Sequence, residues 1–402
     1  MNKIFDYLHL KDVGLIELVF ALYPILAGYQ YGSIPLAILV LVIIDVLAYV
    51  RVGRLRLANC KPMAYLFVFV FIHISIWAFI IDNPSGAYFN NAIYYIAVFI
   101  SFFIFCPAIR YDKMIGSMNW VSLLVIGGLL YQMPFVLAGG VVHPLKLPFL
   151  PAPENSRLLN EVLRPTSFFW EPQSIVSFLL IPLFLSLVEK KYVWFGIVAI
   201  SMLLSTSTTG IVYVFGIIGL FMYNNKKKAS SVFLFSLIMI ALLFIMINTE
   251  YFTMGIAKLM DSDVTTDSRT AQGWWVCSSM PFRYWLLGAP FEDAYHYYLA
   301  GGGMSNENIL IYGKTVYMAT FWMVIFYYGI IGLCFYLAPY FYMIKRDKLI
   351  LPFMFCLLMA LFSNPDFIKG LFLFDMVFAF VFVNRGLLGH NYDSRSHRVR
   401  VR

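Results

Sequence analysis

Apolar and polar residues alternate along this chain in long blocks, and each apolar block has about the length of a membrane-spanning helix. A transmembrane helix needs about 20 apolar residues to cross about 30 Å of hydrocarbon. The blocks predict twelve such helices, at 14–31, 34–50, 62–81, 91–109, 119–141, 172–189, 192–206, 208–223, 231–249, 317–343, 349–363 and 371–384. A tight polar turn joins 192–206 to 208–223, so this pair is either two crossings or a re-entrant dip.

The composition agrees with this pattern. Hydrophobic residues make up 61% of the 402 residues and charged residues 12%, which is about half the charged fraction of a typical soluble domain. We therefore expect an all-α integral membrane protein with a single polytopic domain, residues 1–402, and no separate soluble domain. Glu17 and Asp45 fall inside predicted spans, near one end of each, and we expect both side chains to reach the membrane interface.

The distribution of Lys and Arg predicts the orientation. Short cytoplasmic loops retain positive charge. With both termini in the cytoplasm, all but eight of the 29 Lys and Arg residues fall in cytoplasmic segments. We therefore predict a multi-pass protein with both termini cytoplasmic. The net charge of +8 is then a signal of topology with some attraction to anionic membrane lipids, and nucleic acid is not an expected partner.

Two long loops lie on the opposite side in this prediction, and long loops commonly carry function. The first, 142–171, is rich in proline, which forbids one long helix but allows a short one around 155–163. The second, 250–316, interleaves aromatic residues with Arg269, Arg283 and His296. This mixture fits short amphipathic helices at the membrane interface, and it equally fits sugar binding by aromatic stacking.

Several short motifs follow one another along the chain. The segment 164–172, RPTSFFWEP, resembles the R-x-x-S-x-F-x-E-P segment of bacterial O-antigen and capsule polymerases and of their relative, the O-antigen ligase. Downstream, LLSTSTTG at 203–210 resembles the L-x-S-x-S-x-x-G hairpin of that family. Ser268-Arg269, LGAP at 287–290 and YGIIGL at 328–333 follow in the same order, so the resemblance covers about 144–382.

This resemblance implies a membrane-embedded glycosyltransferase of the bacterial inner membrane, with two large, partly helical periplasmic loops. Its expected reaction is polymerisation of undecaprenyl-diphosphate-linked O-antigen or capsule repeat units, with no cofactor and with a chain-length regulator as a candidate partner. Ligases, which transfer glycan to a lipid A core, have a His-Asn pair late in the second loop. Residues 305–308 here are Ser-Asn-Glu-Asn, which favours a polymerase. A flippase that moves the lipid-linked glycan without chemistry is the alternative from another class.

The expected reaction predicts candidate site residues. Guanidinium groups bind phosphate oxygens bidentately and stay charged, so Arg164 and Arg269 are assigned to catalysis. Glu171 is the candidate base for the acceptor hydroxyl, and His296 is the second. Substrate-binding candidates are Arg283, Lys314, Trp170, Trp274, Trp275 and Asn306.

Each assignment has a simpler alternative. The cations and aromatic rings suit anchoring at lipid headgroups, and His296 suits an ordinary interfacial position. Glu171 suits a carboxylate that interacts favourably with the positive end of a helix dipole. The segment 261–263, Asp-Ser-Asp, resembles a metal-binding motif of nucleotide-sugar transferases, but nucleotide sugars are cytoplasmic and this segment is predicted outside. No metal site is therefore predicted.

Overall fold

A computed structural model describes residues 2–31, 34–53, 60–81, 86–148, 150, 164–169, 171–224, 269–290, 294–301, 316, 318–365, 368 and 370–385, with isolated positions 233, 237, 240 and 244. These residues are helical or lie in turns and connections, apart from one short antiparallel pairing of β1 (Gln30–Tyr31) with β2 (Ile34–Pro35). The predicted all-α fold class is confirmed for this part of the chain.

Six helices precede the predicted first loop. They are α1 (Asn2–Tyr7), α2 (Leu15–Leu26), α3 (Leu36–Val52), α4 (Lys61–Ile80), α5 (Gly86–Ala108) and α6 (Tyr111–Leu137). The helix α6 begins before the predicted position 119, because it continues through the polar residues Asp112 and Lys113 beyond its apolar block.

The later helices differ widely in length. They are α7 (Pro172–Val188), α8 (Tyr192–Leu204), α9 (Thr208–Asn224), α12 (Arg269–Ser278), α13 (Phe282–Leu287), α14 (Ala294–Ala300), α16 (Thr320–Arg346), α17 (Leu351–Ala360) and α18 (Gly370–Val383), with a 3-10 turn, η4 (Lys348–Ile350), before α17. The short helices α12, α13 and α14 all fall within the stretch 250–316, and the helix predicted around 155–163 lies outside the described residues.

Each predicted span other than 231–249, most of which lies outside the described residues, coincides with a helix. Among the described residues, four helices are long and apolar enough to cross a membrane: α4, the 88–108 part of α5, α6 and α16. Shorter apolar helices are α2, α7, α8, α9, α17 and α18. These helices indicate a membrane protein, while the number of crossings and the sidedness stay predictions.

The helix α16 is not one straight rod. Gly329 has φ 68° and ψ −173°, which interrupts the helical backbone. Thr320 and Tyr336 both line one small cavity inside the bundle. In a straight helix, 16 residues would separate them by about 24 Å. The chain therefore bends at Gly329, and α16 consists of two arms, 320–328 and 330–346.

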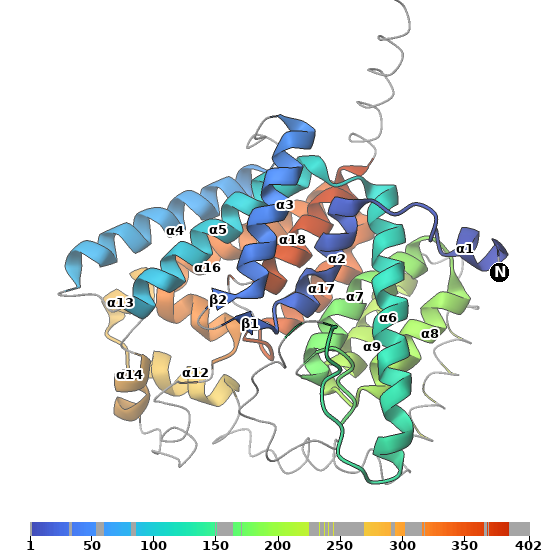
Figure 1. Ribbon diagram of the computed structural model, residues 1–402. Helices are drawn as coiled ribbons and strands as arrows, with labels where there is room; N and C mark the ends of the chain where they lie inside the picture. Colours follow the sequence, from blue (N-terminus) through green and yellow to red (C-terminus); the bar gives the residue numbers. More distant parts are fainter. Residues whose placement is uncertain are drawn as a thin grey trace, which may run out of the picture.

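The centre of the bundle is formed by α7 and α18, most of whose side chains are buried. The helix α18 packs against α2, α5 and α7, while α7 packs against α6, α8 and α9. Figure 1 shows α4 and α6 at opposite edges of this bundle, with α12 and α14 at its lower side, toward which α6 descends. Outer helices expose large apolar side chains, such as Phe79 (91%) and Val50 (77%), which suits contact with lipid tails.

Glu17, in α2, is fully buried, so the expectation that it reaches the interface is wrong. Its Oε1 accepts hydrogen bonds from Arg51 Nη1 at 2.8 Å and from the backbone N–H of Arg110 at 3.0 Å. The carboxylate has these partners inside the bundle and does not need to extend to water. Asp45, in α3, is half-buried and accepts a hydrogen bond from Ser101 Oγ at 2.8 Å.

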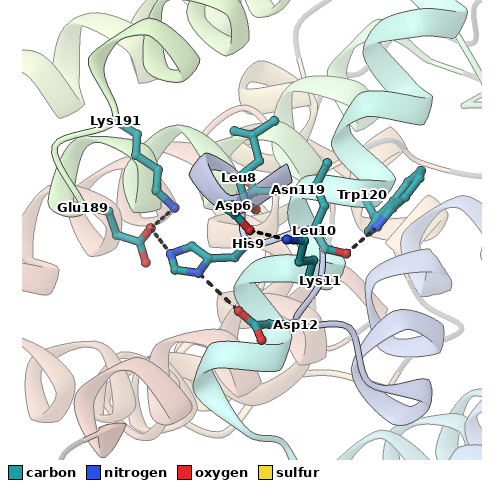
Figure 2. Close-up of polar contacts among 10 residues, drawn as sticks. All are labelled: Asp6, Leu8, His9, Leu10, Lys11, Asp12, Asn119, Trp120, Glu189 and Lys191. Carbon is teal, nitrogen blue, oxygen red and sulfur yellow. Dashed lines mark hydrogen bonds and ion pairs between the residues drawn. The ribbon is translucent and has the colours of Figure 1, made fainter. Parts of the chain in front are cut away.

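The N-terminal segment docks onto α6 (Figure 2). The side chains of Asn119 and Trp120 donate to main-chain carbonyls of residues 8 and 10, at 2.8 and 3.1 Å. His9 lies 3.8 Å from the carboxylate of Glu189, in the connection between α7 and α8. Gly116 permits this docking, because a Cβ there would collide with carbonyl oxygens of the N-terminal segment. This segment therefore ties α6 to the α7–α8 connection.

Candidate functional site

The segment 164–169 is held against α6 by the side chain of Gln132, which is 2% exposed. Its Oε1 accepts hydrogen bonds from the backbone N–H groups of Thr166 at 2.9 Å and Ser167 at 2.7 Å. Its Nε2 donates to the carbonyl of His143 at 2.7 Å. One amide therefore fixes both described ends of the predicted first loop to the same point of α6.

Ser167 corresponds to the serine of the R-x-x-S motif, and its contacts indicate a structural role. Its backbone has a φ of 50°, a left-handed conformation that is unfavourable for serine. Its Oγ donates to the carbonyl of Val125 at 2.7 Å, and its own carbonyl accepts from the N–H of Leu145 at 2.7 Å. Gly128 makes room, because a Cβ there would lie 2.5 Å from Ser167 Oγ. The serine therefore shapes the loop that carries Arg164.

Arg164 and Glu171 lie at the two ends of this short loop and are both half-buried. Glu171 is the N-cap residue of α7, with Pro172 at the first helical position, a common arrangement at helix starts. The Glu171 side chain makes no capping hydrogen bond to the first turn, although its charge lies at the positive end of the helix dipole. Its assignment as a base and its electrostatic alternative both stay open.

The second motif, 203–210, meets the same end of α7. Ser205, Thr206, Ser207 and Thr209 are all buried, so this polar turn lies inside the protein. A Cβ at Gly210 would lie 3.2 Å from a methyl group of Val176 in α7. The helix α8 has 13 residues and a length of about 20 Å, too short to cross the hydrocarbon, which favours the re-entrant interpretation. Two family-like motifs therefore converge on the first turns of α7.

A partly open cavity lies beside this convergence, between α7, α9, α16, α17 and α18. It has about 30 Å³ of room, enough for one or two water molecules. Its lining residues are Ser177, Leu180, Tyr213, Thr320, Tyr336, Tyr340, Leu357, Ala360, Leu361, Asn364, Phe372 and Asp375. Thr320 donates through Oγ1 to the carbonyl of Asn364 at 2.6 Å. Polar groups such as these therefore lie beside the cavity, although its lining is mostly apolar.

Asp375 in this cavity was missed by the sequence reasoning. It lies in α18, whose other residues are glycine, alanine, valine, leucine, methionine and phenylalanine. An ionisable residue inside a membrane span is a functional candidate by default, so its position in the predicted span 371–384 was an available signal. The sequence-based candidates came from the long loops, and Asp375 lies outside them.

Two of the other motifs, LGAP at 287–290 and YGIIGL at 328–333, meet each other at a pair of glycines. Gly288 (φ 86°) follows α13, and Gly329 (φ 68°) interrupts α16. A Cβ on Gly288 would collide with the carbonyl of Tyr327, and a Cβ on Gly329 would collide with the carbonyl of Leu286. The N–H of Ala289 donates to a carbonyl of α16 at 2.6 Å. The LGAP and YGIIGL segments therefore form one close backbone contact.

His73, in α4, joins this contact and was also not singled out from the sequence. Its Nε2 lies 2.6 Å from the carbonyl oxygen of Leu287 and 3.1 Å from Nε1 of Trp77, and its ring lies edge-on to the ring of Tyr328 at 4.9 Å. The histidine connects α4 to the end of α13.

The other candidates are placed as follows. Arg283 is exposed on α13, with its guanidinium 4.8 Å from the ring of Tyr284. His296 is exposed on α14, Trp274 is 54% exposed on α12, and Trp275 is half-buried. Figure 1 shows α13 beside α4, at the far side of the bundle from α6, to which the Arg164 segment is tied. Arg283 and Arg164 are therefore not neighbours.

Some of the predicted site residues lie wholly or partly outside the described part of the structure. Arg269 begins α12, but its side chain is outside the described part of the structure. Trp170, Asn306 and Lys314 lie outside the described residues. Cys277, within α12, is buried, and burial raises the pKa of its thiol to about 12. It is therefore protonated at neutral pH and does not serve as a nucleophile.

Comparison with known proteins adds no family: no family model matches the sequence, and no similar curated protein or solved structure is found. The resemblance to the polymerase and ligase family therefore depends on the motifs alone.

Proposed function

We propose that this protein is a membrane-embedded glycosyltransferase that polymerises lipid-linked oligosaccharide units on the periplasmic face of the bacterial inner membrane. The observation that supports this most is the convergence at α7. The segments 164–172 and 203–210, which carry the family resemblance, lie more than 30 positions apart in sequence and meet at the first two turns of one helix. Their joint placement is what a shared site requires.

The chemistry assigned to this place is a transfer between two carriers. The bond between the anomeric carbon of the growing glycan and its diphosphate breaks, and a hydroxyl of the next lipid-linked unit forms the new glycosidic bond. Arg164 neutralises the departing diphosphate, because a guanidinium holds two phosphate oxygens at once. Glu171 accepts the proton that the acceptor hydroxyl loses. Arg269 is the second phosphate-binding group in this proposal.

The rigid loop geometry supports these roles. Gln132 accepts hydrogen bonds from two backbone N–H groups of the loop, and the loop's Ser167 hydroxyl donates to the carbonyl of Val125 in α6, at 2.7 to 2.9 Å. These three bonds hold the turn that carries Arg164 against α6. Catalytic groups are effective when neighbouring structure holds them in a productive position. The buried motif serine and its glutamine partner then act as positioning residues.

The test is deletion of the gene in its host, followed by analysis of surface and lipid-linked glycan. We expect single repeat units on the lipid core, and polymer restored by the wild-type gene. Arg164→Ala should abolish polymer, and Arg164→Lys should reduce it strongly because the charge remains while the two-pronged geometry is lost. Lys146→Ala is the matched control, since Lys146 is an exposed cation of the same predicted loop.

The outcomes discriminate between the classes. Normal polymer in both Arg164 variants would contradict the assigned role. Accumulation of completed polymer on the lipid carrier would indicate a ligase. Repeat units retained on the cytoplasmic face would indicate a flippase, a candidate that gains some support from the ionisable side chains of His73 and Asp375 inside the bundle.

A further inference from the structure

The short helix α13 and the neighbouring end of α4 share an exposed apolar face. None of the residues of α13 is buried. Phe282 and Leu287 of α13 are 76% and 57% exposed, and Phe79 in the last turn of α4 is 91% exposed. Large apolar side chains gathered in this way are stable where lipid tails cover them. Lipid is therefore the expected neighbour of this face.

Aromatic rings join the two helices near the end of a predicted span. The ring of Trp77, in the last turn of α4, lies edge-on to the ring of Tyr284 in α13, with 5.8 Å between the ring centroids. The helix α4 is long and apolar enough to cross a membrane, and Trp77 lies near the end of the predicted span 62–81. Trp and Tyr are enriched where the hydrocarbon meets the lipid headgroups. These features indicate that α13 lies at the level of the headgroups.

Arg283 is an exposed cation at this place. Its guanidinium lies 4.8 Å from the centroid of the Tyr284 ring and donates from Nη2 to the Tyr284 hydroxyl at 3.4 Å. Across the part of the chain that the structure describes, Arg283 forms no ion pair with a carboxylate. A guanidinium at headgroup depth is well stabilised by phosphate oxygens. The charge of Arg283 therefore complements a lipid phosphate.

The number of cations favours a phosphodiester over a diphosphate. Apart from Arg283, no Lys or Arg occurs in α13, in α14 or in the last ten residues of α4. A phosphodiester carries a single negative charge, whereas a diphosphate carries more and is better bound by several cations. Figure 1 also places α13 at the far side of the bundle from α6, to which the Arg164 segment is tied. A membrane phospholipid therefore fits this place better than the sugar carrier does.

We propose that α13 and the end of α4 bind one anionic phospholipid, with Arg283 contacting its phosphate and its acyl chains lying against Phe282, Leu287 and Phe79. This site is separate from the sugar transfer proposed above and does not depend on it.

Lipid bound to α13 should also stabilise the break in α16. The N–H of Ala289, directly after α13, donates to the carbonyl of Phe326 in α16 at 2.6 Å. On its other side, the carbonyl oxygen of Leu287 lies 2.6 Å from Nε2 of His73 in α4. Opening the Ala289 hydrogen bond requires α13 to move away from α16, and a lipid that holds α13 in place opposes this movement.

The first experiment counts lipids bound to the purified full-length protein by native mass spectrometry. The protein is titrated with phosphatidylglycerol or with phosphatidylcholine of the same acyl chains. Arg283→Gln should lower the affinity of one phosphatidylglycerol site about tenfold, the effect of one charge-assisted contact at an exposed position, and so retain one lipid fewer. Arg283→Lys should keep most of the affinity because the charge remains. Lys146→Gln, at an exposed cation of the predicted first loop, is the matched control and should change nothing.

Hydrogen–deuterium exchange at Ala289 assigns the effect to this place. At a concentration about ten times its dissociation constant, phosphatidylglycerol should slow this exchange roughly tenfold in the wild type and not in Arg283→Gln. Equal protection by the two lipids would overturn the proposal, and so would full protection by phosphatidylglycerol in Arg283→Gln. Added undecaprenyl diphosphate should leave the protection by phosphatidylglycerol intact. Displacement of phosphatidylglycerol would assign Arg283 to the sugar carrier and overturn the proposal too.

Discussion

Replacement of Gln132 by methionine tests whether one amide orders the loop that carries Arg164. Methionine has a similar length but cannot accept the two backbone hydrogen bonds from Thr166 and Ser167, which measure 2.9 and 2.7 Å. Each buried donor left without a partner costs about 1 to 3 kcal/mol. Two such donors amount to about 2 to 6 kcal/mol, and the loop can avoid this cost by leaving α6. We therefore expect local release of the loop with the bundle still folded.

Hydrogen–deuterium exchange followed by mass spectrometry measures this release at the segment 164–169. A local cost of about 2 kcal/mol or more corresponds to exchange faster by a factor of about 30 or more at the two amides. Tyr131→Phe is the control, because Tyr131 precedes Gln132 in α6 but is 62% exposed. Unchanged exchange at both amides in Gln132→Met would refute the reasoning, since the glutamine would then not be what restrains the loop.

Three further changes have expected outcomes. Glu17→Gln removes the charge that pairs with Arg51 and should lower the free energy of unfolding, and with it the unfolding temperature. The loss should be smaller than the roughly 3 to 5 kcal/mol typical of a broken buried pair, because Arg51 is 22% exposed, and an unchanged unfolding temperature would contradict this. Gly288→Ala should destabilise the chain more than Gly219→Ala, where a Cβ meets nothing within 4 Å, and equal thermal unfolding would exclude the predicted collision. Cys277 should react with iodoacetamide at pH 8 only after denaturation, because it is buried and its pKa is raised to about 12, and rapid labelling of the native protein would contradict that burial.

The helices could be predicted from the sequence because long apolar blocks have few alternatives inside a membrane. The break in α16 could not, although Gly329 is visible, because glycine is common in transmembrane helices and usually leaves them intact. What enforces the break is close backbone contact with Gly288, 41 positions earlier. A contact of that sequence separation has no local signature, so a single sequence does not reveal it.

The residues of the candidate site could also be predicted only in part from the sequence. The motif drew attention to Arg164 and Glu171, and the structure places Glu171 at the start of α7 and Arg164 at the other end of the short loop before it. Gln132 was not predictable, since its partners lie 34 and 35 positions away and glutamine has no special frequency at such positions. Asp375 was predictable in principle, because a lone carboxylate within an apolar block is conspicuous.

The polar interior at the cavity follows from helices that end inside the bundle. The start of α16 and the end of α17 leave backbone groups that no helix of their own can satisfy. The structure pairs them with each other: the N–H of Thr320 donates to the carbonyl of Asn364, and the N–H of Phe321 donates to the carbonyl of Leu361, both at 2.8 Å. In a low-dielectric environment this pairing is required for stability. The meeting of two helix ends therefore places polar groups at one point inside the bundle, and Thr320, Asn364 and Asp375 line the cavity beside it.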